Sequence, residues 1–155
     1  MASLTQTRLT ANALLREHGL AQQGWTFEFD NAVNRGGQCR YSSKTISMSR
    51  KLVPLWEEDQ VRQTLLHEIA HALTKGHHHD AVWMAKAVSI GFTRGTRTHS
   101  NATPPKKWLV LCGDCGEIGK VHRRKTNACC ARCYKRGRIN PTSYVLNPEA
   151  LSPAR

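Results

Sequence analysis

The sequence predicts an α+β domain followed by a separate small module, and three observations lead to this expectation. Apolar residues recur at helical spacing in three segments, at 5–20, 54–76 and 80–90. Between the first two of these segments, apolar and polar side chains alternate as they do in strands. Near the C-terminus, four of the six cysteines form two C-x-x-C pairs, a pattern typical of a compact metal-binding unit.

The elements of the first domain can be justified in order. Residues 5–20 are amphipathic and end near Gly19, which predicts an N-terminal helix. Three short strands are expected next, at 25–30, 38–41 and 44–49, with a glycine-containing turn before the second. We expect these strands to form a small β-meander.

Two more helices follow. Residues 54–76 begin with an acidic first turn, which suits the helix dipole, carry an apolar face and end at Gly76. Residues 80–90 begin at Asp80, a candidate N-cap, and stop at Gly91.

Composition then suggests four regions. We expect a main domain over 1–98, a linker over 99–107, a cysteine module over 108–138 and a flexible tail over 139–155. Short strands are expected in the cysteine module at 108–111 and 120–123.

The overall composition favours a soluble protein of the reducing cytoplasm. Of 155 residues, 39% are hydrophobic and 22% are charged, and no apolar run approaches the roughly 20 residues of a membrane-spanning helix. The first residues do not resemble a secretory signal. In a reducing compartment, paired cysteines are expected to bind metal rather than to form disulfides.

The charge is strongly positive and unevenly spread. The chain carries a formal net charge of +12, and residues 104–138 hold ten basic residues against two acidic ones, a balance of +8. Such a segment favours a polyanionic partner, most simply nucleic acid. The alternative is a surface that only maintains solubility.

The most specific motif is H-E-x-x-H, formed by His67, Glu68 and His71. Residues four apart lie about 40° apart around a helix, so both imidazoles can reach one Zn²⁺ from the same face. Glu68 is then placed to act as a base on water at the metal. The alternative is a helix face that carries these residues by chance.

A catalytic zinc ion needs a third protein ligand and one open position. The candidates are His77, His78, His79 and Asp80. The spacing H-E-x-x-H-x-x-G-x-x-H would select His77, but Thr74 stands where that pattern requires glycine. His79 begins the predicted helix over 80–90, where a ligand would be held rigidly.

These residues resemble the SprT-like (Spartan) metalloprotease family. The resemblance is carried by Leu65–Ala72, by His79–Trp83 with its histidine four positions before an aromatic residue, and by Arg35–Cys39 with Ile46–Ser49. It extends from about residue 8 to residue 138.

The resemblance implies a zincin-like catalytic domain that hydrolyses peptide bonds. It implies His67, His71 and His79 as zinc ligands and Glu68 as the general base, which takes a proton from water and later protonates the leaving amine. An extended substrate is expected to pair with an edge strand near 44–49. Cys39 is expected to be a small buried apolar residue rather than a regulatory ligand.

The paired cysteines predict a second, structural zinc site of the ribbon type. Its ligands are Cys112, Cys115, Cys130 and Cys133, with 14 residues between the pairs. Four cysteine ligands leave no open position for catalysis. Cys129 is an alternative to Cys130, although only Cys130 gives the usual spacing.

A catalytic domain followed by such a ribbon also resembles bacterial SprT-like proteins, whose best-known activity is cleavage of proteins bound or crosslinked to DNA. The candidate DNA contacts are Arg123, Arg124, Lys125, Lys135, Arg136, Arg138 and Trp108, the last by stacking on an unpaired base. Binding is expected to be largely independent of sequence. Two alternatives remain, a regulatory DNA-binding zinc protein without activity and a peptidase without a nucleic-acid role.

Overall fold

The computed structural model describes residues 1–93 and 104–150. The chain divides into two compact units, Met1–Thr103 and Pro104–Arg155. The predicted domain boundary at residue 98 and the linker residues 99–103 lie outside the described residues. Each unit has its own sheet and its own buried cluster, so each is described by itself.

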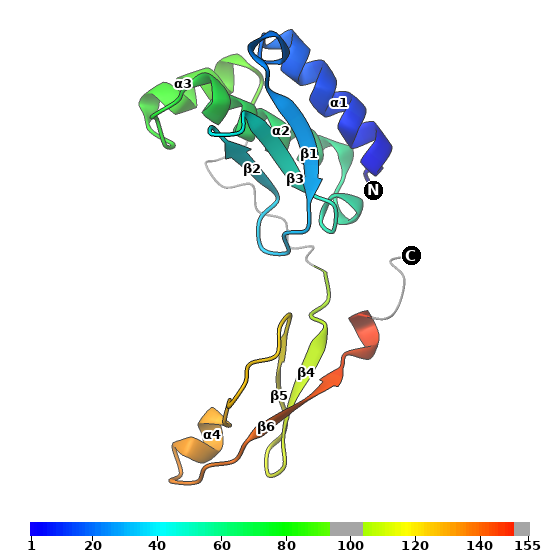
Figure 1. The fold of residues 1–155 in the computed structure, drawn as a ribbon, viewed down its shortest axis with the longest axis vertical. Coiled ribbons are helices and arrows are strands. Elements are labelled where there is room, and N and C mark those ends of the chain that lie inside the picture. The colour runs from blue at the N-terminus through cyan, green and yellow to red at the C-terminus, as the bar shows by residue number, and fades with distance from the viewer. Residues whose placement is uncertain (94–103, 151–155) are drawn as a thin grey trace. The chain divides into compact units, whose positions relative to one another are not determined.

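The N-terminal unit contains a three-stranded sheet whose order differs from the prediction. Its strands are β1 (Thr26–Asp30), β2 (Gly37–Arg40) and β3 (Thr45–Ser49), in the spatial order β1-β3-β2 (Figure 1). Strands β2 and β3 are antiparallel, whereas β1 runs parallel to β3. The expected meander is therefore wrong, because a meander would place β2 in the middle.

Burial explains why β3 is central. All five of its residues are buried, and the hydroxyl of Ser47 donates to the Asp30 carboxylate at 2.7 Å while that of Ser49 donates to the Ala32 carbonyl. These bonds satisfy two polar side chains that would otherwise be costly inside the sheet. Because β3 is paired on both sides, the prediction of a substrate-binding edge near 44–49 is wrong, and the edge next to it is β2.

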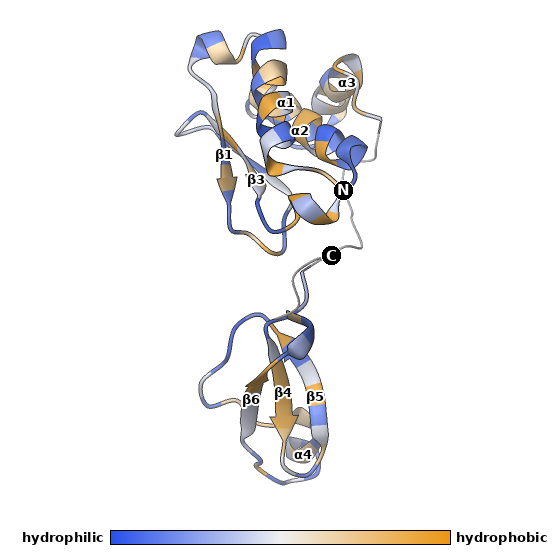
Figure 2. Ribbon diagram, turned by 90° about the vertical axis from the view of Figure 1, so that its right-hand side faces the viewer, coloured by the Kyte–Doolittle hydropathy of each residue, from blue (hydrophilic) through white to orange (hydrophobic). Residues whose placement is uncertain are grey.

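Three helices complete this unit: α1 (Leu4–Glu17), α2 (Glu58–Leu73) and α3 (Ala81–Ser89). Helices α1 and α2 pack against each other, α1 contacts β1, and α2 contacts β2 and β3, so both helices lie on the same face of the sheet. Hydrophobic and hydrophilic segments alternate along α1 and α2 (Figure 2). Short 3₁₀ helices at Ala21–Gln23 and Val53–Leu55 connect the elements.

A continuous apolar core lies between the helices and the sheet. It includes Leu14 from α1, Ile46 and Met48 from β3, and Leu65 and Ile69 from α2. The apolar face of α2 anchors the helix in the core, so side chains on its other side are available for a functional site.

The C-terminal unit, here called the ribbon, has strands β4 (Trp108–Cys112), β5 (Gly116–Val121) and β6 (Thr142–Leu146), with the short helix α4 (Ala131–Tyr134). The strand order is β5-β4-β6, and both pairings are antiparallel. Strand β5 begins earlier than the predicted 120–123. A 3₁₀ turn follows at Pro148–Ala150.

The predicted flexible tail over 139–155 is wrong where it is described. Strand β6 pairs along the whole of β4, from Cys112 opposite Thr142 to Trp108 opposite Leu146. The buried Asn147 side chain donates to the Lys106 carbonyl, so part of the predicted linker belongs to this unit as well. A third strand supplies backbone partners that β4 would otherwise lack.

No helix within residues 1–93 and 104–150 is both long enough and apolar enough to cross a membrane.

Candidate active site and structural metal centre

Helix α2 brings three predicted site residues to one face. His67 and Glu68 are buried, and His71 lies one turn further along, so residues four apart share a side of the helix. The His67 ring packs against Trp83 and Phe92, with ring centroids 4.8 and 5.6 Å away. These apolar rings fix the orientation of the imidazole.

His79 reaches the same point from the segment before α3. Its backbone has φ +58, a left-handed conformation that histidine adopts more readily than most residues. The following residue, Asp80, is the N-cap of α3 and accepts a hydrogen bond from the Trp83 N–H at 2.9 Å. The capped helix α3 therefore begins directly after His79, and this cap holds His79 in its strained conformation.

The three imidazoles converge through their Nε2 atoms. The Nε2–Nε2 distances are 3.3 Å for His67 to His71, 3.0 Å for His71 to His79 and 3.1 Å for His79 to His67. Nitrogen ligands about 2.05 Å from a tetrahedral zinc ion lie about 3.3 Å from one another. The donor set and its spacing therefore fit a zinc ion.

The protonation of these rings also suits a metal. Burial and the neighbouring imidazoles lower the pKa of His67 and of His71 to about 4, so both are neutral at pH 7 and keep a lone pair. The His71 ring also donates to the backbone carbonyl of His77. This bond helps to orient the ring toward the other two imidazoles.

Glu68 lies beside the histidines, and its carboxyl group interacts with the backbone of β2 and with the positive charge of Arg35. Burial raises its pKa to about 7, whereas a hydrogen bond from the Cys39 N–H and the positive charge of Arg35 act in the opposite direction. A carboxyl group with a pKa near neutrality suits proton transfer in both directions. Glu68 opens into a pocket of about 250 Å³, lined by Gly37, Gln38, Cys39, Tyr41, His67, Glu68, His71 and His78.

The other predicted candidates lie outside the cluster. His77 pairs with Asp80 through a contact of 2.7 Å, and His78 lines the pocket without joining the three convergent nitrogens. Cys39 is half-buried in the same pocket, and burial together with the charge of Glu68 raises the pKa of its thiol to about 12. A thiol of that kind is a poor metal ligand and a poor nucleophile at neutral pH.

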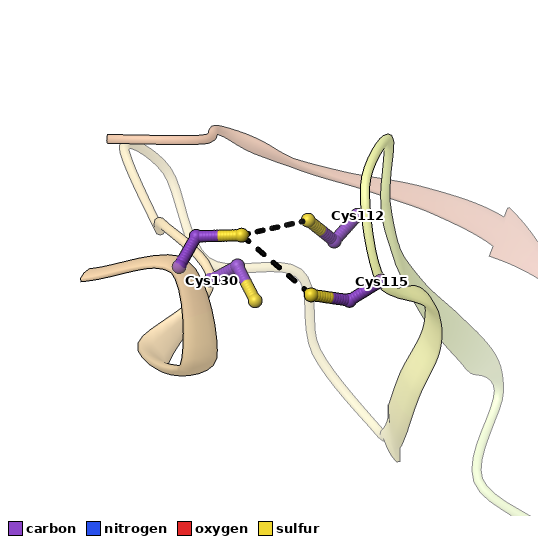
Figure 3. A group of neighbouring side chains, drawn as sticks. Cys112, Cys115 and Cys130 are labelled. Atoms are coloured by element: carbon purple, nitrogen blue, oxygen red, sulfur yellow. Dashed lines mark hydrogen bonds between the residues drawn. The ribbon is translucent and has the colours of Figure 1, made fainter. Parts of the chain in front are cut away.

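The second site lies in the ribbon. The sulfur atoms of Cys112, Cys115, Cys130 and Cys133 lie within 4.8 Å of one another, and Figure 3 labels Cys112, Cys115 and Cys130, whose side chains point toward a common centre. The Sγ atom of Cys133 is 3.7 Å from that of Cys112 and 3.6 Å from that of Cys115. Sulfur ligands of a tetrahedral zinc ion lie about 3.8 Å apart, so this set also fits zinc.

The surroundings separate Cys130 from its neighbour Cys129. Cys130 is buried, and backbone N–H groups of Cys133 and Arg132 lower its pKa to about 7, which favours the thiolate that a metal requires. Cys129 is exposed and lies outside the cluster. Asn140, which sequence reasoning missed, donates to the Cys133 sulfur at 3.5 Å.

Comparison with known families matches residues 6–104 to the SprT-like family. The chain belongs to the SprT-like family. Among solved structures, the metallopeptidase zymogen of Methanocaldococcus jannaschii jannalysin is similar, with 16% identity and a TM-score of 0.48 over 54% of this chain and 79% of that one. No curated protein matches the chain. The family and the histidine site together support a zinc metalloprotease.

The predicted DNA contacts of this SprT-like chain lie on the ribbon and differ in their surroundings. Arg123, Lys125, Lys135 and Arg136 are exposed. The Arg124 guanidinium lies 4.7 Å from the centre of the half-buried Trp108 ring, and Arg138 pairs with Asp114 at 3.0 Å.

Sequence reasoning missed Tyr134 on the same unit. Its side chain is 65% exposed and lies at the end of α4, among the basic residues that follow the second cysteine pair. An aromatic residue within a basic run was the signal that could have found it.

Proposed function

We propose that this SprT-like protein is a zinc-dependent metalloprotease that cleaves proteins bound or crosslinked to DNA and is brought to DNA by its ribbon. The observation that carries the proposal is the convergence of three imidazole Nε2 atoms within 3.3 Å beside a buried carboxyl group. One catalytic and one structural zinc ion are proposed, held by the histidine and cysteine clusters.

The chemistry follows from the residues around the pocket. His67, His71 and His79 would hold a zinc ion, which would supply Lewis acidity to the reaction. Glu68 accepts a proton from the attacking water and passes it to the leaving amine, a double role for which a pKa near 7 is suited. The Trp83 and Phe92 rings pack against the His67 ring, exclude water from that side of it and fix its orientation.

The edge of β2 is the proposed binding site for an extended substrate. Gly37, Gln38 and Cys39 line the pocket, and β2 is hydrogen-bonded to a neighbouring strand only through β3 within this sheet. An exposed edge can add a peptide as a further strand. The substrate backbone would then run past Glu68 and the histidines.

Recruitment to DNA is proposed from the ribbon's charge. Exposed arginine and lysine side chains can contact phosphates, and such contacts carry little sequence information. The Arg124 guanidinium and the Lys107 ammonium lie 4.7 and 5.3 Å from the centre of the Trp108 ring, so two positive charges stand beside an aromatic ring that an unpaired base could contact. Arg138 is expected to contribute less, because Asp114 already neutralises it.

The first experiment is cleavage of a DNA-binding protein by zinc-loaded enzyme, with and without DNA. A Glu68→Gln variant that retains zinc is the control, and we expect it to lose at least about 10²-fold in rate. Cleavage that requires both Glu68 and DNA supports the proposal. Cleavage that ignores DNA favours a general peptidase, whereas no cleavage with zinc and DNA bound favours a regulatory DNA-binding protein.

A second experiment tests the ribbon. An Arg123→Ala/Lys125→Ala variant should bind DNA more weakly and reduce the slope of log K against log salt by up to about 2. Arg16→Ala/Arg62→Ala removes the same charge from the N-terminal unit and serves as the matched control. Equal losses in the two variants would contradict recruitment by the ribbon.

A further inference from the structure

Gly36 lies immediately before β2 and Gly37 is its first residue, and neither has the positive φ that makes glycine necessary elsewhere in the chain. What they share is lack of space for a side chain. A Cβ atom on Gly36 would overlap Cη2 of Trp56, and one on Gly37 would lie 2.8 Å from Cγ and 2.9 Å from Oε1 of Glu68. Glycine in a strand often marks such a close approach.

The two obstructions differ in kind. Trp56 is an indole that is 3% exposed and belongs to the apolar core, so it has nowhere to move. Glu68 has a flexible side chain that ends in the pocket, so it can rotate away from an added methyl group. A methyl group at Gly36 should therefore disturb folding, whereas one at Gly37 should displace the carboxyl group.

The backbone of β2 also holds Glu68 directly. The Gly36 carbonyl accepts a hydrogen bond from Ser49 N–H, so the backbone groups of Gly36 point toward β3. By the alternation of an antiparallel strand, those of Gly37 and Cys39 point away from β3. The Cys39 N–H, which points away from β3, donates a hydrogen bond to the Glu68 carboxylate. Strand β2 thus makes room for Glu68 at one residue and binds it two residues later.

We propose that Gly37 is a positioning residue for the general base, because its missing side chain lets the β2 backbone lie against Glu68 and fixes the carboxyl group beside the three imidazoles. The inference rests on the proposed function. A misplacement of about 1 Å in a reacting group can cost about 10²-fold in rate. Gly37 therefore acts through Glu68 and not through the fold.

The test compares zinc-loaded full-length Gly37→Ala and Gly36→Ala with the wild type. For Gly37→Ala we expect unchanged zinc content, a melting temperature within about 2 °C of wild type and a loss of kcat of about 10²-fold that exceeds any change in KM. For Gly36→Ala we expect a melting temperature lower by about 5 °C or more. Gly119→Ala in β5 is the matched control, since a Cβ there meets nothing within 4 Å.

A second readout does not depend on turnover. A peptide hydroxamate binds zinc and hydrogen-bonds a neighbouring carboxyl group, so its affinity, measured by calorimetry, reports the position of Glu68. We expect Gly37→Ala to weaken this affinity about 10-fold in the wild-type background and to have no further effect in Glu68→Gln.

The outcomes separate the inference from the proposed function. Wild-type kcat and hydroxamate affinity in Gly37→Ala, or a loss of stability equal to that of Gly36→Ala, would overturn the positioning role while the wild type remains a protease. A wild-type protein that binds zinc but neither cleaves nor binds the hydroxamate would overturn the proposed function, and the inference with it.

Discussion

Glu68 is surrounded by groups that act on its carboxyl in opposite directions. Burial disfavours the charged form, whereas the Cys39 N–H and the Arg35 guanidinium favour it, and the balance is a pKa of about 7 against an ordinary value of 4.5. The residue therefore holds a proton in the folded metal-free protein over a pH range in which the unfolded chain has lost it. This difference makes the stability of the fold depend on pH.

We predict that Glu68 destabilises the metal-free protein as the pH rises. Its contribution to stability is fully present below pH 4.5 and is lost as the pH rises through 7, with a total of up to about 3 kcal/mol. The glutamine in Glu68→Gln cannot titrate. The free energy of unfolding of this variant should therefore equal that of the wild type near pH 4.5 and exceed it at pH 8. Urea unfolding of both metal-free proteins at the two pH values measures this, and a constant difference would refute it.

At the scale of elements, the third ligand depends on how α3 begins. His79 occupies a left-handed conformation immediately before the cap, and the Asp80 carboxylate bonds both the Trp83 N–H and the His77 ring. The segment between α2 and α3 is thereby fixed at the residue that must reach the other imidazoles. The cap thus serves the metal site as well as the helix.

We predict that Asp80→Ala lowers the free energy of unfolding by about 1 kcal/mol and weakens zinc binding at the histidine site about 5-fold or more. Asp80→Asn is the matched control, because asparagine caps helices about equally well and should largely restore both quantities. Urea unfolding and competition with a chelator measure the two effects. Zinc affinity in Asp80→Ala equal to that of the wild type would show that His79 is held by other contacts.

The elements themselves were largely predictable, but their arrangement was not. Apolar periodicity and terminal glycines located α1, α2 and α3 to within a few residues, because these signals are local. The order β1-β3-β2 depends on which strand is buried on both sides, and that follows only once the helices cover the sheet. Strand β6 was missed because its pairing with β4 joins segments about 30 residues apart and is not visible in the local sequence.

At the scale of the whole molecule, the two units are stabilised differently. The N-terminal unit has a continuous apolar core, whereas the buried cluster of the ribbon consists of Cys112, Cys130 and Cys133 with Cys115 and Ile118 packed against it. Four thiols without a metal contribute little to folding. The stability of the ribbon should therefore come from its zinc ion.

We predict that a strong zinc chelator unfolds the ribbon and leaves the N-terminal unit folded, because the core of that unit consists mainly of apolar side chains that pack without a metal. Amide NMR spectra or limited proteolysis would follow the two units separately. Cys130→Ala should reproduce the effect without chelator, and Cys129→Ala is the matched control with an exposed thiol. A folded ribbon in Cys130→Ala would assign the ligand role to Cys129 instead.

The sequence by itself determined the chemistry of both sites, because the ligand pairs are set by local spacing. His67 and His71 share a helix face wherever that helix lies, and each C-x-x-C pair forms its own half-site. The family resemblance implied His79 as the third ligand, and the structure places it with His67 and His71. Only the tertiary structure decided which strand forms the open edge and why Gly37 carries no side chain. These depend on contacts between segments far apart in the chain, and such contacts leave no period in the sequence.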